Sequence, residues 1–170
     1  ELDVKVDGNN VDELVGNVKL LNTFLLTAKN ERNLVIDTLL LRSVQEKEVR
    51  TLQLESEFLT AKAEGNFLPT MAWNDLSQLL AEYKLYFFEN ESDRTGYYAK
   101  KTRQLVKQKY EIDYQVETKN LSRFLAFISP NIYVSPGAKA EGMFKMDNTA
   151  FLTLTSTADT TRYAKNEFVN

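Results

Sequence analysis

The side chains of this chain that could take part in catalysis are carboxylates, hydroxyls and amines, because its 170 residues include no His and no Cys. This composition excludes Ser–His–Asp and Cys–His nucleophile systems, thiolate chemistry, and zinc sites built on imidazole or sulfur. Carboxylates recur at even spacing, as in Glu111, Asp113 and Glu117. On a strand they share one solvent-facing side, whereas an acid–base pair for glycoside hydrolysis needs one carboxyl in an apolar pocket. We therefore expect that the protein is not an enzyme and that it has no catalytic residue, cofactor or metal. A hydrolase built on an Asp or Glu pair is kept as a third hypothesis.

A basic cluster offers a second kind of chemistry. Lys100, Lys101 and Arg103 could contact an anionic membrane surface, where each Lys or Arg contributes about 1 kcal/mol. The interpretation that we favour is a solvated helix face paired with nearby acidic residues. Residues 89–109 are accordingly predicted to form a mobile insertion or a solvated helix.

The most informative pattern in the chain is a repeat. The segment Ala61–Phe67 returns as Ala138–Phe144 with only the sixth position changed, and Gly16–Thr23 echoes the Gly142–Thr149 segment. Internal repeats are typical of arrays of equivalent structural units. A repeated strand motif builds a surface more readily than a reaction centre, so it favours a binding or scaffolding role.

Alternation of apolar and polar residues predicts strands around the repeats. Over residues 110–117 every even position is apolar and every odd position is polar. The alternation changes phase near Phe58 and Leu59, which predicts a β-bulge or bend there. Capping residues and helical spacing predict helices over about 71–88 and 120–128. The fold class is thus predicted as α+β, mainly β, with a curved antiparallel sheet of repeated strand units.

Composition and overall charge limit the class of protein and its compartment. A formal charge of −3 and a pI near 5.2 argue against a general nucleic-acid binder. The chain has no signal peptide and no run of about 18 apolar residues, and its lack of Cys fits either a reducing cytosol or a periplasm. We read the chain as part of a larger protein, with a first strand unit over residues 1–68, a helix and charged insertion over 69–109, and a second strand unit over 110–170.

The order of these segments resembles a known family. The resemblance is carried by residues 35–43, 50–61 and 64–67, then by Asp75–Ser77, and again by Tyr110–Thr157. This order is similar to the repeat region of the AsmA-like superfamily, most closely its TamB (translocation and assembly module) branch. The resemblance implies a periplasmic envelope protein of a Gram-negative bacterium, anchored in the inner membrane through sequence outside this chain. It further implies repeats stacked into a long curved β-sheet with a hydrophobic groove, which moves phospholipid between membranes and assists outer-membrane protein assembly with a BamA-like barrel partner.

A groove of this kind would bind acyl chains on the apolar side of the strands. The candidate groove residues are Leu52, Leu54, Phe67, Ile112, Tyr114, Val116, Phe144, Leu152 and Leu154.

The alternative hypothesis is a compact β-rich binding module of a surface protein that recognises carbohydrate or protein through loops and exposed tyrosines. A carbohydrate-stacking platform could include Tyr97, Tyr98, Tyr110, Tyr114 and Tyr133, but the interpretation that we favour for Tyr110 and Tyr114 is half-buried sheet residues, because aromatics favour strands. The two hypotheses differ in whether the Ile112 and Tyr114 face is fully covered or forms a partly open apolar concavity.

Overall fold

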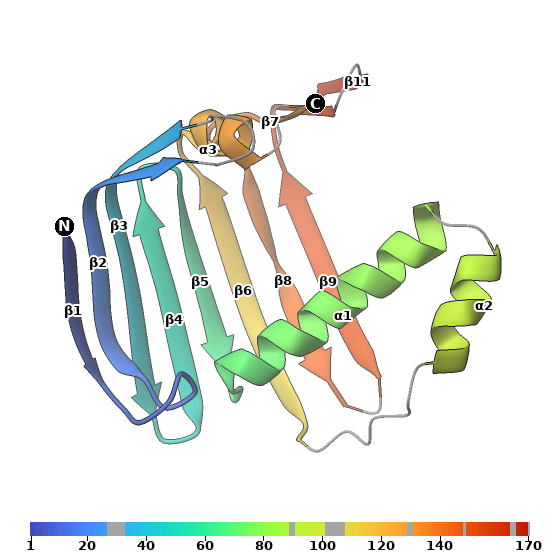
Figure 1. Ribbon diagram of the computed structural model, residues 1–170, viewed down its shortest axis with the longest axis horizontal. Coiled ribbons are helices and arrows are strands. Elements are labelled where there is room, and N and C mark those ends of the chain that lie inside the picture. The colour runs from blue at the N-terminus through green and yellow to red at the C-terminus, as the bar shows by residue number, and fades with distance from the viewer. Residues whose placement is uncertain are drawn as a thin grey trace.

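The computed structural model describes residues 1–26, 33–88, 91–100, 108–128, 131–147, 149–163 and 166–169. Its main feature is an open antiparallel sheet of eight strands in the order β1-β2-β3-β4-β5-β6-β8-β9, beside a three-stranded sheet in the order β11-β10-β7 (Figure 1). The strands are β1 (Leu2–Asp7), β2 (Val15–Leu26), β3 (Asn33–Glu46), β4 (Val49–Ser56), β5 (Leu59–Gly65), β6 (Tyr110–Thr118), β7 (Ile132–Val134), β8 (Lys139–Met146), β9 (Ala150–Thr157), β10 (Thr160–Tyr163) and β11 (Asn166–Val169). The helices of the described residues are α1 (Pro69–Phe88), α2 (Glu91–Lys100) and α3 (Leu121–Ile128).

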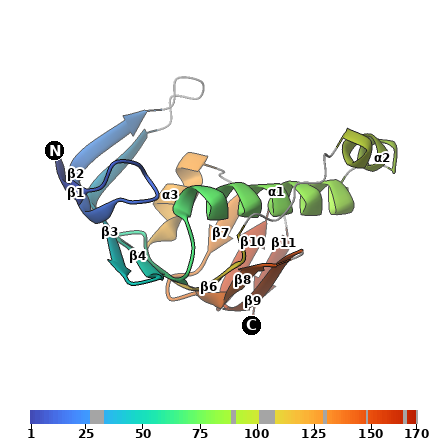
Figure 2. The same cartoon turned by 90° about the horizontal axis from the view of Figure 1, so that it is seen from below.

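The large sheet curves around one side of the molecule. Figure 2 shows α1 lying on the concave side, and Figure 1 shows it crossing β5, β6, β8 and β9 and continuing past β9. The helix α3 lies at the end of the sheet, near the β4–β5 turn. These features confirm the predicted class, a mainly β α+β fold with a curved antiparallel sheet. Strands from residues 1–68 and 110–170 join in this one sheet through the pairing of β5 with β6.

Both predicted helices are present. The first begins at Pro69, two residues earlier than expected, because the fixed φ of proline suits the first helical position. The second spans Leu121–Ile128, close to the predicted 120–128. The helix α2 occupies part of the predicted insertion, and residues 101–107 lie outside the described residues.

Of the β-bulge or bend predicted near Phe58 and Leu59, the bulge is wrong and the bend is present, as a tight turn that separates β4 from β5. The strands β4 and β5 pair antiparallel with Glu55 opposite Thr60, so the phase change comes from a tight hairpin turn. The Ser56 hydroxyl oxygen accepts hydrogen bonds from the backbone N–H groups of Phe58 and Leu59, at 3.2 and 3.1 Å, and holds the turn. A two-residue turn and a bulge both shift alternation by one position, so the pattern alone did not separate them.

The repeated segments occupy equivalent places in the sheet. The strands β5 and β8, which carry the two copies, flank β6 on either side. A Cβ added at Gly65 would lie 1.9 Å from the carbonyl oxygen of Glu111, and one at Gly142 would lie 2.0 Å from that of Thr153. Gly16, in the partial third copy, meets the carbonyl oxygen of Lys5 at 2.0 Å in the same way. At each of the three glycines the adjacent backbone approaches too closely for any side chain, and glycines of this kind let a sheet curve.

Two apolar clusters hold the helices to the sheet. Beneath α1, the buried side chains of Phe67, Ala72, Tyr110, Ile112 and Phe144 form one cluster, with Leu76 and Leu79 packed against it. Near α3, the buried Leu34, Ile36 and Phe58 form the other, which Phe124 contacts with its ring centre 5.6 Å from that of Phe58.

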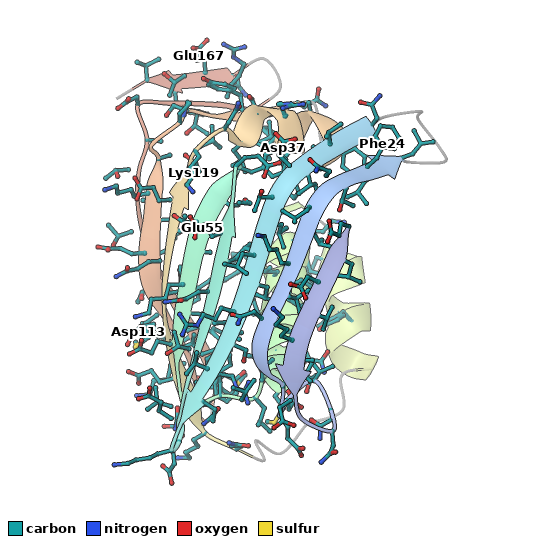
Figure 3. All side chains as sticks on the ribbon, turned by 90° about the vertical axis from the view of Figure 1, so that its left-hand side faces the viewer. Phe24, Asp37, Glu55, Asp113, Lys119 and Glu167 are labelled. Carbon is teal, nitrogen blue, oxygen red and sulfur yellow. The ribbon has the colours of Figure 1, made fainter. Side chains whose placement is uncertain are left out.

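The hairpin of β2 and β3 extends beyond β4 and bends toward the side of α1, as Figure 3 shows near Phe24. Asn22 has a φ of 45° at this bend. The Glu57 carboxylate accepts hydrogen bonds from the backbone N–H groups of Asp37 and Thr38, at 2.8 and 3.2 Å. It thereby satisfies donors for which β4 offers no partner, since the pairing of β3 with β4 ends at Leu39.

Candidate hydrophobic groove

The concave face carries a continuous row of apolar side chains across the sheet. Residues directly opposite each other in an antiparallel pair share a face, so the register defines the row. Its members, from β1 to β8, are Val4, Val18, Leu41, Leu54, Ala61, Val116 and Ala140. We call this set the central row.

Much of the central row is accessible. Val4 is 48 % exposed and Leu41 is 39 % exposed, while Leu54 and Val116 are half-buried. None of the row belongs to the cluster beneath α1. The concave face over β1 to β4 lies to one side of α1 (Figures 1 and 2). The chain therefore has an apolar trough that is covered in one part and uncovered in another.

The trough face is nearly free of charge. Outside the bent end of the β2–β3 hairpin, where Asp37 of β3 is exposed, Arg50 is the only charged residue that the described part of the large sheet places on this face, and it is 4 % exposed. Its Nη1 donates to the Leu14 carbonyl oxygen and the Ser43 hydroxyl, both at 2.9 Å, and its Nη2 donates to the Asp12 carbonyl oxygen. The guanidinium thus binds the β1–β2 loop to β3 and β4.

The opposite face is polar and charged. Figure 3 shows Glu55 and Asp113 on the side away from α1. The ammonium of Lys62 lies 2.7 Å from the carboxylate of Glu64, and this hydrogen bond and charge lower the pKa of Glu64 below its ordinary value. This contrast between the faces is typical of a sheet whose concave side excludes water.

A hollow of about 510 Å³ also lies over β4, β5, β6 and β8, where eight polar or charged residues line it together with Leu54, Ala61, Val116 and Ala140 of the central row. Two neighbouring rows of the charged face line it, one through Gln53, Lys62, Gln115 and Glu141 and the other through Glu55, Thr60, Glu117 and Lys139. Apolar ligands would gain little there, so we place the candidate site in the open trough.

The predicted groove residues divide into two groups. Ile112, Phe144 and Phe67 are buried beneath α1, and Leu52 and Leu152 pack against them. These five residues contribute to the core and are covered by the helix.

The other predicted residues lie closer to the uncovered trough. Leu54 and Val116 belong to the central row, and Leu154 is 62 % exposed on the edge strand β9. The half-buried Tyr114 lies over Gly142 and donates from its hydroxyl to the Thr153 carbonyl oxygen at 2.6 Å. Tyr110 is 3 % exposed and donates to Asp75 at 2.7 Å. The two tyrosines are therefore sheet residues and do not form an exposed stacking platform.

The groove residues predicted from the sequence include none from the N-terminal half of the trough. Val4, Val18 and Leu41 join the central row from β1, β2 and β3. The alternation of Leu2, Val4 and Val6 with charged residues was a usable signal for β1. The segment around Leu41 has apolar residues at both parities, so its trough-facing side could not be recognised without the register.

The predicted basic cluster is described only in part. Lys100 is the last residue of α2, whereas Lys101 and Arg103 lie outside the described residues. Within the described ranges, no three acidic side chains gather closely enough to hold a metal ion. No helix in that same part of the chain has the length and apolar character needed to cross a membrane.

No family model, no curated protein and no solved structure matches this chain.

Proposed function

We propose that this chain is a non-enzymatic segment of a hydrophobic β-sheet groove that binds the acyl chains of phospholipid. The observation that carries the proposal is the accessible central row, beside which the buried Arg50 is hydrogen-bonded to the β1–β2 loop and to Ser43 of β3. In line with the TamB resemblance, we place the segment in a larger, membrane-anchored periplasmic protein that transports phospholipid between membranes, assists outer-membrane protein assembly, or does both. A BamA-like barrel is the partner that this role implies.

The dimensions of the central row suit a lipid tail. Its seven strands stand about 4.8 Å apart, so the row spans roughly 29 Å at right angles to the strands. One phospholipid tail fills about half of the ~30 Å hydrocarbon core of a bilayer. A tail can therefore lie along the row within its length, with its axis across the strands and beside α1.

The energy available from such contact is sufficient for binding. Each buried methylene contributes about 0.8 kcal/mol, so ten of them contribute about 8 kcal/mol. That sum corresponds to a micromolar dissociation constant before the entropy of association is subtracted. Binding of this strength would hold lipid and still release it, as transport requires.

The test compares neighbouring substitutions on one strand. Val116→Asp places a carboxylate in the central row, whereas Gln115→Asp places the same carboxylate on the charged face. Phospholipid recovered with each purified variant is measured by mass spectrometry, and binding of a fluorescent fatty-acid probe is titrated.

We expect Val116→Asp to weaken probe binding by at least about tenfold, because burying an unpaired carboxylate against a lipid tail costs several kcal/mol. Gln115→Asp should bind as the unsubstituted chain does. Equal binding by both variants, with both folded by circular dichroism, would contradict the proposal. Absence of lipid together with capture of a polypeptide would instead favour the binding-module alternative.

A further inference from the structure

The strand β9 forms an unprotected edge of the large sheet. Among the described residues β8 is its only partner, so its outer backbone groups have no strand beside them. Its eight residues, Ala150–Thr157, contain no charge and no proline. Proteins usually protect such an edge with charged residues, proline or a bulge, and an uncharged strand of this composition pairs readily with another chain.

The strand at the opposite edge, β1, has features that would let it pair with a strand such as β9. Leu2, Val4 and Val6 point to the trough face, and Asp3 and Lys5 lie on the charged face. The sheet has eight antiparallel strands, an even number, so β1 and β9 run in opposite directions. A second molecule in the same orientation therefore offers a β1 strand that is antiparallel to β9, with its apolar side on the same face.

We propose that β9 pairs with β1 of a second copy of this chain, head to tail, so that the trough continues from one molecule into the next. The contact is heterologous and leaves one free edge at each end. It goes beyond lipid binding by a single copy, since it assigns an interaction surface and its partner.

The exposed area of the chain supports such a contact. A compact monomer of 19.5 kDa exposes about 8,500 Å², whereas this chain exposes 12290 Å², an excess of roughly 3,800 Å². A standard stable interface buries about 1,600 Å² in total. The excess over the whole chain is therefore larger than the area that one interface of ordinary size buries.

The helix α1 provides a further observation. It continues past β9 in Figure 1, where the described residues place no further strand of the large sheet. The trough-facing Leu154 and the charged-face Phe151, at 62 % and 54 % exposed, remain accessible on β9. A β1 strand added to β9 would lie against Leu154 and below the projecting part of α1.

Disulfide trapping tests the proposal cleanly because the chain contains no Cys. Two single variants, Lys5→Cys and Thr153→Cys, are mixed and oxidised, and the products are separated on a non-reducing gel with one variant carrying a size tag. Both positions lie on the charged face, at opposite edges of the sheet. Thr60→Cys replaces Thr153→Cys in the control, because Thr60 lies on the same face in an interior strand.

We expect the mixed Lys5→Cys and Thr153→Cys dimer to exceed the Thr60→Cys control. Thr153→Cys homodimers as the main product would show β9 pairing with itself and would overturn the head-to-tail arrangement. Yields equal to the control would overturn the proposal altogether.

A charge at the edge gives an independent measurement. Thr155→Lys should raise the dissociation constant for self-association by about tenfold in sedimentation experiments, because edge lysines oppose strand addition. Thr60→Lys, on the same face of a paired strand, should leave it unchanged. Neither substitution alters the central row. A Thr155→Lys variant that self-associates less but still binds lipid would therefore separate this proposal from the proposed function.

Discussion

Gly16, Gly65 and Gly142 are the residues through which the repeat acts on the structure. Each stands where the adjacent strand brings a carbonyl oxygen to about 2 Å from the position of a Cβ. At Gly142, the ring of Tyr114 also occupies the space above the backbone, with its hydroxyl 2.7 Å from that position. The repeated glycine therefore serves the curvature of the sheet, and with it the concavity of the trough.

Substitution of Gly142 tests this role. We expect Gly142→Ala to lower the free energy of unfolding by about 1–3 kcal/mol, as overpacking of a filled site does. Urea unfolding monitored by circular dichroism provides the measurement. Gly96→Ala is the matched control, because a Cβ there meets nothing within 4 Å and alanine favours the helix α2. An unchanged stability for Gly142→Ala would show that the close approach is not required.

Tyr110 provides a prediction on pH. Its burial, followed by the hydrogen bond to the Asp75 carboxylate, raises the pKa of Tyr110 above its ordinary value of 10.0. The folded protein thus holds this proton more tightly than the unfolded chain. The stabilisation is complete below the unfolded pKa and is lost progressively as pH rises above about 10.

Tyr110→Phe should therefore be less stable than the unsubstituted chain at pH 8 by about 1–3 kcal/mol, since Asp75 loses its donor. The difference should shrink between pH 10 and pH 11, where unfolding of the unsubstituted chain becomes favoured by ionisation of the tyrosine. Urea midpoints at these pH values measure both effects. A difference that grows with pH would contradict this account.

At the scale of elements, α1 depends on a residue far away in the chain. The Asp12 carboxylate accepts hydrogen bonds from the backbone N–H and the hydroxyl of Thr70, at 2.8 and 2.5 Å. It satisfies a donor of the first helical turn and places negative charge at the positive end of the helix dipole. Arg50 holds the same loop from the other side, at the carbonyl oxygen of Asp12.

Removing this cap should loosen the helix over the trough. Asp12→Ala is expected to lower the free energy of unfolding by about 1 kcal/mol, with a range of 0.5–2. Hydrogen exchange should show faster exchange in the first turn of α1, while Asp12→Asn, which keeps an acceptor, should show a smaller effect. Equal protection of α1 in all three proteins would contradict the capping role.

The sequence predicted these elements unevenly, for physical reasons. Capping residues and helical spacing placed the bounds of α1 and α3 within two residues of those observed. The alternation over residues 110–117 identified β6 and its trough side. The turn at Glu57 and Phe58 was missed because neither residue is a usual turn former, and the local hydrogen bonds that the Ser56 hydroxyl accepts from Phe58 and Leu59 are only a weak signal in sequence.

At the scale of the whole molecule, sequence patterns could not predict which part of the trough α1 covers. Ile112 and Val116 lie two rows apart on the same side of β6, and both follow from alternation. Only the path of α1 decides that Ile112 is buried and Val116 is accessible. That path is held by tertiary contacts, among them the hydrogen bonds of Asp12 with Thr70 and the packing of Leu76 and Leu79, which do not appear in a local sequence pattern.

The contact between Asp12 and Thr70 also sets an order of events during folding. It joins positions separated by 58 residues, so the first turn of α1 cannot receive its cap until the β1–β2 loop and the intervening strands are in place. Contacts between residues this far apart in the sequence form slowly, because the chain loses the entropy of loop closure before it gains the energy of the contact. During synthesis the apolar side of the first four strands consequently emerges from the ribosome before α1 can dock, and this interval is the period in which a chaperone would be most needed.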